Sequence, residues 1–165
     1  MELGIFVYAY LPMRANATHR AEMFSQILFG EIFEIIARHQ DWAKVRLIHD
    51  NYIGWIESVT ISRYLGQVPE ESYITDRYVT TEDATMLIVN DNRLFVPKGS
   101  LLPQSIVEKP EFFIGENKYF LLSDLDSPHE DTVRERLVEY AQNMIDTPYL
   151  WGGRSQWGID CSGFA

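Results

Sequence analysis

The amino-acid sequence predicts a mainly β protein, with one or two small barrels ahead of a helical segment that opens an α+β domain. Short apolar or alternating runs follow one another between turn residues over residues 5–122. Near residue 128 the spacing of the apolar residues changes from that of strands to that of a helix. A glycine-rich stretch then leads to Cys161, where a second helix is expected to begin. These changes predict boundaries that divide the chain into residues 1–66, 67–127 and 128–165.

The first barrel is predicted over residues 1–66 from five short strands. Residues 42–47 alternate with period two, as a half-buried strand does. Residues 14–23 are polar and predict a long loop. Five short strands at this spacing are typical of a small closed barrel. The apolar runs are residues 5–10, which Pro12 ends, 26–29, 31–37, 42–47 and 54–57, with turns at 39–41 and 50–51.

Residues 67–127 predict two further hairpins behind a linker at residues 68–72. Asparagine- and glycine-containing turns separate the paired runs, as hairpins require. Two arrangements stay open: a second, diverged barrel, or strands that extend the first one. The predicted hairpins are residues 85–96, with a turn at 90–92, and residues 112–122, with a turn at 115–117; another turn is predicted at 97–100.

A helix is predicted to begin at Ser127, which can accept from unpaired helical N–H groups as a cap. Pro128 suits a first helical turn, and Glu130-Asp131 suit the positive end of the helix dipole. The helix should end before Thr147-Pro148, because a residue that precedes proline disfavours the helical conformation. One apolar face at helical spacing comprises Val133, Leu137, Val138, Ala141 and Met144.

Composition excludes several classes of function. The net charge of -10 argues against a nucleic-acid partner, because phosphate binding needs clustered Lys and Arg. No apolar run approaches the length of a membrane span, and no signal peptide is visible, so we expect a cytoplasmic protein with no membrane partner, although a chain whose leader had been removed would look the same. The single cysteine, Cys161, excludes disulfides and cysteine-based metal sites, and we predict no cofactor and no metal.

Residues 147–164 carry the chemistry that the sequence predicts. Gly152-Gly153 and Gly158 allow tight turns and close backbone approach. Asp160 stands at a cap position, so Cys161 would lie in the first turn of a helix, facing unpaired N–H groups and the positive dipole end. Both favour the thiolate, which is the nucleophilic form. The alternative is a glycine-rich turn between helices, with Cys161 packed inward as a small apolar residue.

Two regions resemble known families. Gly30-Glu31, Trp42-Ala43-Lys44-Val45 and Tyr52-Ile53-Gly54-Trp55-Ile56 resemble bacterial SH3-like domains over most of residues 3–62. The glycine-rich stretch resembles the NlpC-type cell-wall peptidases, which are papain-like cysteine peptidases. The motif residues that match are Tyr149, Trp151, Gly152, Gly153, Ser155, Gly158, Asp160, Cys161, Ser162 and Gly163. The resemblance therefore implies SH3-like barrels ahead of the first, helical part of a papain-like domain.

This resemblance implies roles for particular residues. Cys161 would be the nucleophile, and the Tyr149 hydroxyl would lie near the nucleophile and the oxyanion. Asp160 and Ser162 would line the substrate groove, with Ser155 also counted among the substrate-binding residues. Trp151 would pack nearby or form a wall of the pocket.

The substrates implied are peptidoglycan-derived peptides. Family members with SH3-like domains typically cut between γ-D-glutamate and a diamino acid, and they require a free N-terminal L-alanine. Tyr52 resembles the tyrosine through which the SH3-like domain helps to recognise that amino terminus; the alternative is an aromatic residue at the barrel edge. Acidic side chains suit a cationic terminus, with Asp160 as the first candidate and Asp50 as the second. Recycling of imported wall peptides is the setting that this predicts.

The catalytic base is the component that the sequence does not supply. His19, His39, His49 and His129 all precede Cys161, whereas the family's base follows the nucleophile. His129 would be the substitute if the order were permuted, but the order from Tyr149 to Gly163 is the unpermuted one. We therefore expect a truncated chain that is inactive by itself. Two alternatives to a fragment of a peptidase are a non-catalytic SH3-like module that binds wall peptides and a degenerate scaffold.

Overall fold

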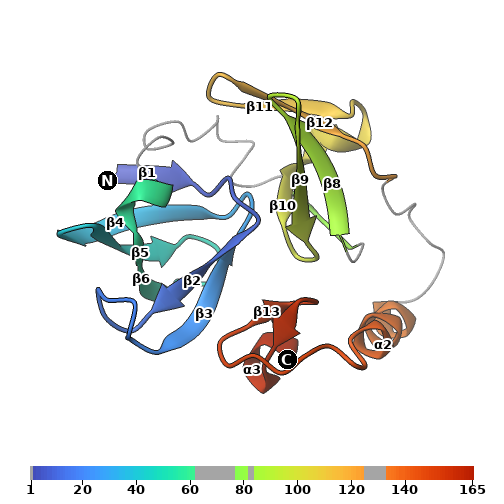
Figure 1. The fold of residues 1–165 in the computed structure, drawn as a ribbon. Helices are drawn as coiled ribbons and strands as arrows, with labels where there is room; N and C mark the ends of the chain where they lie inside the picture. Colours follow the sequence, from blue (N-terminus) through green and yellow to red (C-terminus); the bar gives the residue numbers. More distant parts are fainter. Residues whose placement is uncertain (1, 62–76, 82–83, 125–132) are drawn as a thin grey trace.

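The computed structural model describes residues 2–61, 77–81, 84–124 and 133–165 (Figure 1). Its sheets are antiparallel and its described helices are few and short, which confirms the mainly β fold class. The predicted linker at residues 68–72, the helix cap at residues 127–131, and His129 lie outside the described residues. Both predicted domain boundaries, at residues 66 and 127, also lie outside them, so the division into domains stays a prediction.

The described residues contain fourteen strands, two α-helices and two 3₁₀ helices. The 3₁₀ helices are Ser58–Thr60 and Gln104–Val107, and the α-helices are α2 (Val133–Asn143) and α3 (Cys161–Phe164). The strands are β1 (Glu2–Ile5), β2 (Tyr10–Arg14), β3 (Met23–Leu28), β4 (Ile32–His39), β5 (Trp42–Leu47), β6 (Ile53–Glu57), β7 (Arg77–Val79), β8 (Ala84–Val89), β9 (Asn92–Pro97), β10 (Leu101–Pro103), β11 (Glu111–Ile114), β12 (Asn117–Leu121), β13 (Arg154–Ser155) and β14 (Gly158–Ile159).

Strands β1 to β6 form one six-stranded sheet in the order β1-β4-β5-β6-β2-β3, which we call the barrel. Its interior is a buried cluster in which Phe6, Phe33 and Val45 are fully enclosed. The predicted turns are present: Gln40 between β4 and β5 has φ 50°, and Asn51 between β5 and β6 has φ 61°. The long polar loop predicted at residues 14–23 connects β2 to β3.

The prediction of one strand over residues 5–10, ended by Pro12, is wrong. The chain leaves β1 after Ile5 and enters β2 at Tyr10, so Pro12 lies inside a strand. Pro12 pairs with Gln26 of β3, whereas β2 meets β6 only at Arg14. A proline is tolerated at such a position, because its missing N–H leaves no gap in a second ladder of hydrogen bonds.

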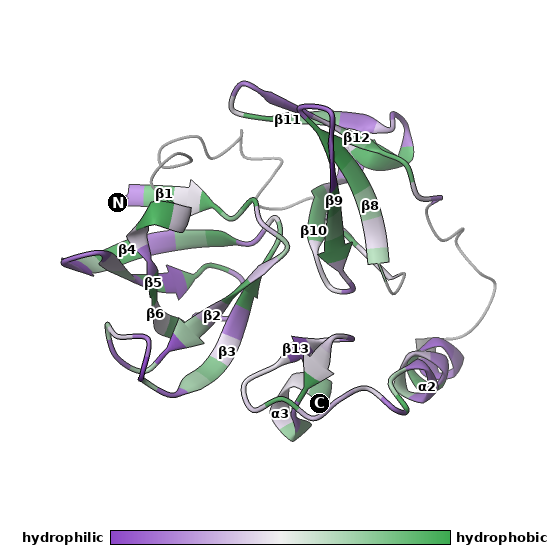
Figure 2. Cartoon of the chain, viewed as in Figure 1, coloured by the Kyte–Doolittle hydropathy of each residue, from purple (hydrophilic) through white to green (hydrophobic). Residues whose placement is uncertain are grey.

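Residues 77–121 form a four-stranded sheet in the order β11-β12-β8-β9 and a two-stranded sheet of β7 and β10. Both predicted hairpins are present. The β8–β9 turn has Asn90 at φ 48° and Asp91 at φ 63°, the two positive values that a type I′ hairpin needs. In the described ranges these sheets share no strand with the first sheet. Figure 2 shows hydrophobic residues along β8, β9 and β10.

The two β regions share a hydrophobic core. Phe29, just after β3, is fully buried, and its ring centroid lies 6.5 Å from that of Phe112 and 5.7 Å from that of Tyr119. Gly30, at φ 79°, follows immediately, and a Cβ at this position would lie 1.8 Å from the Leu101 carbonyl oxygen. Only glycine permits this close approach. The Leu101 N–H donates to the Phe29 carbonyl at 2.9 Å, so backbone pairing accompanies the shared core.

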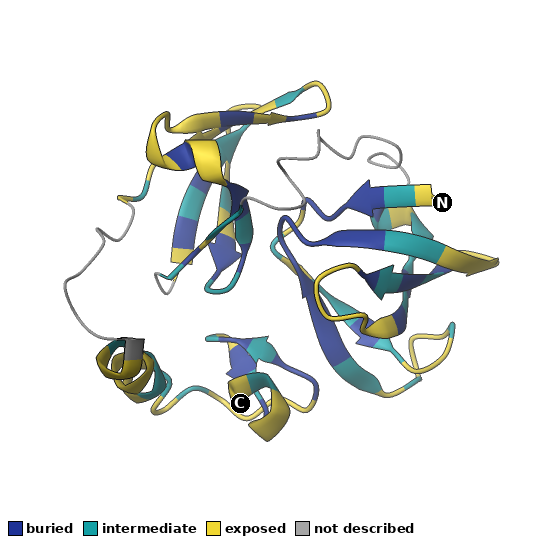
Figure 3. Cartoon of the chain, turned by 180° about the vertical axis from the view of Figure 1, so that it is seen from behind, coloured by how far each residue is buried: buried dark blue, intermediate teal, exposed yellow. Residues whose placement is uncertain are grey.

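The C-terminal segment, residues 147–165, lies against both β regions (Figure 1). The Gln156 side chain accepts from the Lys98 N–H at 3.2 Å, between β9 and β10, and Arg154 contacts β3. Figure 3 shows α2 as mostly exposed, in contrast to the buried strands. The apolar face predicted for this helix is open at Leu137 and Val138, which are 62% and 51% exposed. No helix among the described residues is long and apolar enough to span a membrane.

Replacing Phe29 with alanine should destabilise both β regions together. The ring fills the shared core, so we expect a loss of about 3–5 kcal/mol in the free energy of unfolding. Urea unfolding followed by tryptophan fluorescence and by far-UV circular dichroism measures this loss. The matched control is Phe95→Ala, since Phe95 is 48% exposed and its removal should cost less than about 1 kcal/mol. Equal losses in the two variants would contradict a shared core.

Candidate active site

Asp160 organises the segment that bears the cysteine. Its backbone is extended, with φ -109° and ψ -178°, and its Oδ1 accepts from the N–H groups of Ser162 at 3.0 Å and Gly163 at 2.8 Å. This is the N-cap that the sequence predicted, because a carboxylate here satisfies donors that have no helical partner. Cys161 is consequently the first residue of α3 and is exposed, so the alternative in which it packs inward does not hold.

The same carboxylate joins the helix start to the glycine-rich turn. Asp160 Oδ2 accepts from the Gly152 N–H at 2.7 Å, and Oδ1 also accepts from the Ser162 hydroxyl at 2.6 Å. These hydrogen bonds lower the pKa of Asp160 to about 2, with the Ser162 hydroxyl as the largest cause. Asp160 is therefore an anion at neutral pH, with most of its acceptor capacity used inside the protein.

Gly152 brings this segment into contact with the barrel. Its φ is 74°, and a Cβ at this position would lie 2.8 Å from the Met23 carbonyl oxygen and 2.9 Å from the Phe24 Cα. A larger residue would be strained by its backbone angle and would also push the segment away from β3. Gly152 thus sets the distance between the cysteine segment and the first sheet.

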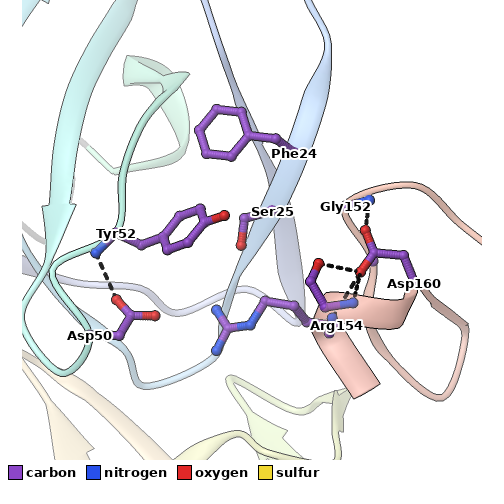
Figure 4. A pocket seen from close by; sticks show the side chains of 10 residues that line it. Phe24, Ser25, Asp50, Tyr52, Gly152, Arg154 and Asp160 are labelled. Atoms are coloured by element: carbon purple, nitrogen blue, oxygen red, sulfur yellow. Dashed lines mark hydrogen bonds between the residues drawn. The ribbon is translucent and has the colours of Figure 1, made fainter. Parts of the chain in front are cut away.

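A cavity of about 290 Å³ lies between the barrel and this segment (Figure 4). Its volume is close to the lower end of the range for small-molecule sites. Two parts of the chain far apart in sequence contribute to it, so neither forms it alone. Its lining comprises Phe24, Ser25, Asp50 and Tyr52 from the barrel, and Gly152, Gly153, Arg154, Asp160, Ser162 and Gly163 from the C-terminal segment.

The barrel wall of the cavity is built on the turn before β6. Asp50 Oδ1 accepts from the Tyr52 N–H at 2.9 Å, which fixes the turn through Asn51. The Tyr52 ring is 44% exposed and packs against Phe24, with their centroids 5.6 Å apart. Figure 4 shows the Tyr52 side chain directed toward Ser25 and the C-terminal segment. Asp50 and Tyr52 therefore present an acid and a hydroxyl to one space.

Arg154 joins the opposite wall to the barrel. Its backbone N–H donates to Gln26 Oε1 at 2.8 Å, and its Nη1 donates to the Gln26 carbonyl at 2.7 Å. Its Nη2 donates to Glu31 Oε1 at 3.0 Å. Glu31 is 2% exposed, and burial raises the pKa of its carboxyl, an effect that the Arg154 charge partly opposes. His49 Nε2 lies 3.4 Å from Glu31 Oε1 and 3.1 Å from Asp50 Oδ2.

The structure brings only some of the predicted site residues together. Tyr52, Asp160 and Ser162 line the cavity, and Cys161 stands between two of them in the chain. Tyr149, Trp151 and Ser155 are not part of this lining. Their roles stay predictions.

The three predicted residues outside the lining differ in their surroundings. Tyr149 is 68% exposed, whereas Ser155 is buried and its Oγ accepts from the Trp157 N–H at 3.4 Å. Trp151 is exposed, and its Nε1 donates to Glu22 at 2.8 Å, just before β3. Trp151 and Ser155 thus have structural contacts in the chain.

Sequence reasoning missed Phe24, Ser25 and Arg154 in the cavity lining. Arg154 lies within the glycine-rich motif, between Gly153 and Ser155, but the motif does not indicate what its guanidinium contacts. Phe24 and Ser25 fall at the junction of a polar loop and a strand, where no pattern marks them. The second-ranked candidate, Asp50, does line the cavity.

Fold and site together define an SH3-type barrel joined to a segment whose short helix begins at an exposed cysteine. Residues 13–60 match the family described as the bacterial dipeptidyl-peptidase SH3 domain. The chain is similar over 99% of its length to the crystal structure of an NlpC/P60 family protein from Bacillus cereus, with a TM-score of 0.70, 16% identity and 70% of that chain covered. This likeness in fold and the family match confirm the resemblance that the sequence motifs predicted.

Curated relatives are bacterial peptidases. The chain is 28% identical to dipeptidyl-peptidase 6 of Lysinibacillus sphaericus, covering 97% of this chain and 66% of the relative. It is 22% and 24% identical to the γ-D-glutamyl-L-lysine dipeptidyl-peptidases of Bacillus cereus and Bacillus subtilis, covering 89% and 85% of this chain. The chain covers half of each of those two relatives and 66% of the first. It therefore spans between one half and two thirds of the lengths of these three relatives.

Replacing Asp160 with asparagine should destabilise the chain in a pH-dependent way. A carboxyl with a lowered pKa stabilises the folded state above its unfolded value of 3.8, and this contribution is lost as the pH falls toward 2. At neutral pH we expect a loss of about 1 kcal/mol or more, because asparagine has one acceptor oxygen in place of two and cannot accept from both Gly152 and the start of α3. Denaturant unfolding from about pH 7 to about pH 3 measures the difference, which should shrink toward acid.

The control for this experiment is Asp146→Asn. Asp146 is exposed, and its φ of 69° is one that asparagine also adopts readily. A difference between Asp160→Asn and the unaltered chain that stayed constant with pH would show that the ionised carboxylate does not hold the turn.

Proposed function

We propose that this chain carries the nucleophile and the amine-binding pocket of a cysteine peptidase that hydrolyses peptidoglycan-derived peptides. The bond cut would lie between γ-D-glutamate and an L-diamino acid, in peptides with a free N-terminal L-alanine. The observation that carries this proposal is the cavity that Asp50 and Tyr52 of the barrel share with Asp160 and Ser162, the two neighbours of Cys161. Imported wall peptides, recycled in the cytoplasm, are the proposed source of substrate.

The charges of the cavity favour a cationic ligand. Asp160 is ionised at neutral pH, and Asp50 contributes a second, more exposed carboxylate. Arg154 is the cation of the lining, and it already pairs with the buried Glu31. An α-ammonium group placed here gains charge-assisted hydrogen bonds, whereas an acylated nitrogen does not. This supports recognition of a free amino terminus.

Of the two acids, Asp50 is better suited than Asp160 to bind the amine. Asp160 Oδ1 already accepts from three groups, and its Oδ2 accepts from Gly152. Asp50 Oδ1 accepts from one backbone N–H, and its Oδ2 lies 3.1 Å from His49 Nε2, but the carboxylate is partly open, with its side chain 35% exposed. We therefore assign the principal contact with the ammonium group to Asp50, with Tyr52 beside it, and a positioning role to Asp160.

The position of Cys161 relates the cavity to the reaction. A terminal dipeptide held by its ammonium group would extend from the cavity toward α3, where the thiol begins the helix. The thiolate Sγ would attack the γ-carbonyl carbon, the C–N bond would break, and the diamino acid would leave with a proton on its nitrogen. Water would then hydrolyse the thioester and release the dipeptide. These relatives are named dipeptidyl-peptidases, which agrees with the release of two residues.

Both proton transfers need a general base and acid. In this chain every histidine precedes Cys161 in the sequence. The resemblance to NlpC-type peptidases implies a base that follows the nucleophile. We propose that these 165 residues bind the dipeptide but do not turn over substrate by themselves. The non-catalytic alternative, a module that binds wall peptides, shares the binding half of the proposed function and lacks the catalytic half.

The binding half is tested by titrating the chain with L-Ala-γ-D-Glu in a calorimeter. We expect binding that Asp50→Asn weakens on the order of tenfold, because asparagine keeps the turn but removes the charge opposite the ammonium group. N-acetyl-L-Ala-γ-D-Glu should bind at least as weakly to the unaltered chain.

The matched control for the titration is Asp91→Asn, which alters an exposed aspartate of the β8–β9 turn. It should leave the affinity unchanged. If the acetylated and free dipeptides bind the unaltered chain equally well, amine recognition is excluded.

The catalytic half is tested on the longest natural form of the protein. Mass spectrometry should detect release of L-Ala-γ-D-Glu from L-Ala-γ-D-Glu-L-Lys, and Cys161→Ser should abolish it. The nucleophile's loss typically costs several orders of magnitude in kcat. Equal turnover by both proteins would remove Cys161 from the mechanism, whereas binding without any turnover by either would favour the non-catalytic module.

A further inference from the structure

Arg154 is a cation in the wall of a cavity that we propose binds another cation. Its guanidinium would repel an ammonium group if its charge stayed uncompensated. The side chain is 25% exposed, so solvent screens this charge only in part. A second group that neutralises Arg154 would therefore strengthen the preference of this pocket for a cation.

Glu31 supplies that compensation from outside the cavity lining. It lies just before β4, with its side chain 2% exposed, and its Oε1 is 3.0 Å from Arg154 Nη2. Its Oε2 is held by the Leu28 N–H at 2.8 Å and lies 3.5 Å from Arg154 Nη1. The two charges thus meet through both carboxylate oxygens, with the carboxylate fixed by the barrel backbone.

The rest of the Arg154 side chain is equally constrained. Gln26 accepts from the Arg154 backbone N–H through its side chain and from Nη1 through its carbonyl. The guanidinium therefore remains directed toward the barrel, where Glu31 lies. Figure 4 shows the Arg154 side chain crossing the space between the C-terminal segment and Asp50.

We propose that Glu31 is a positioning residue that sets the ligand charge accepted by the cavity, by neutralising Arg154 and leaving Asp50 as the effective charge opposite the ligand. This inference rests on the proposed amine recognition. With the pair neutral, Asp50 and Asp160 give the wall a net negative charge. Without Glu31, the free guanidinium offsets one of these carboxylates and offers itself to anionic ligands instead.

One further ionisable side chain, His49, lies beside the Glu31–Arg154 ion pair. His49 lies between Glu31 and Asp50, within 3.4 Å of the first and 3.1 Å of the second. His49 Nε2 thus lies beside both acids, and all variants are compared at one pH. A purely structural role for the ion pair predicts that its loss weakens all ligands alike, whereas a charge-setting role predicts a change in selectivity.

The experiment compares the affinities of the chain for L-Ala-γ-D-Glu and its N-acetyl form, and the readout is their ratio. In Glu31→Gln we expect the preference for the free amine to fall on the order of tenfold. The double variant Glu31→Gln with Arg154→Gln removes both charges but keeps the hydrogen bond from the backbone N–H of residue 154 to Gln26, so the preference should return toward that of the unaltered chain. Glu34→Gln is the matched control, since Glu34 pairs with Arg46 elsewhere on the barrel and does not line the cavity.

The outcomes separate this inference from the proposed function. An unaltered chain with no preference for the free amine contradicts the proposed function and this inference with it. A preference that persists in Glu31→Gln, or an equal weakening of both ligands there, overturns the role of Glu31 and leaves amine recognition intact. If Glu31→Gln does not fold, Arg154→Gln decides: an undiminished preference supports the inference, and a lost preference overturns it.

Discussion

The contact between Arg154 and the barrel is the interaction on which the geometry of the site depends. The guanidinium leaves the C-terminal segment and ends on Glu31 and Gln26, so it holds the cysteine segment to β3 and the turn that follows it. Desolvating two charges costs much of what their attraction returns, so such a pair contributes more to specificity than to stability. Here the result is one defined position of the segment, with Asp160 and Asp50 facing the same cavity.

Small residues make this contact possible, because both junctions require backbone to approach backbone. Gly152 allows the cysteine segment to reach β3. Gly30, just after β3, allows Leu101 of the second β region to approach the barrel. Phe29 then fills the core that the β regions share. The residues from Met23 to Glu31 therefore serve three partners in turn: the cavity, the ion pair and the second sheet. A change in the position of β3 would consequently alter the cavity, the ion pair and the contact with the second sheet.

Local patterns predicted much of the fold. The alternating residues of β5 and the Asn90-Asp91 turn encode their conformations within a few residues, and both were predicted correctly. The failure at residues 5–10 has a physical cause, because Pro12 is compatible with a strand only if one side of that strand lacks a paired neighbour. That condition depends on the position of β6, which no local pattern contains. The helical face of α2 is likewise a local property, but whether Leu137 and Val138 are covered is not.

The sequence by itself determined most of the strand and turn pattern, the N-cap at Asp160 and the place of Cys161 in the first turn of a helix, since these arise from neighbours within a few residues. Tertiary structure alone decided that Tyr52 and Asp50 meet Asp160 and Ser162 across one cavity. It also decided that Arg154 ends on Glu31, 123 residues away in the chain. Spacing within a motif carries no information about such partners, because packing of the segment against the barrel brings them together.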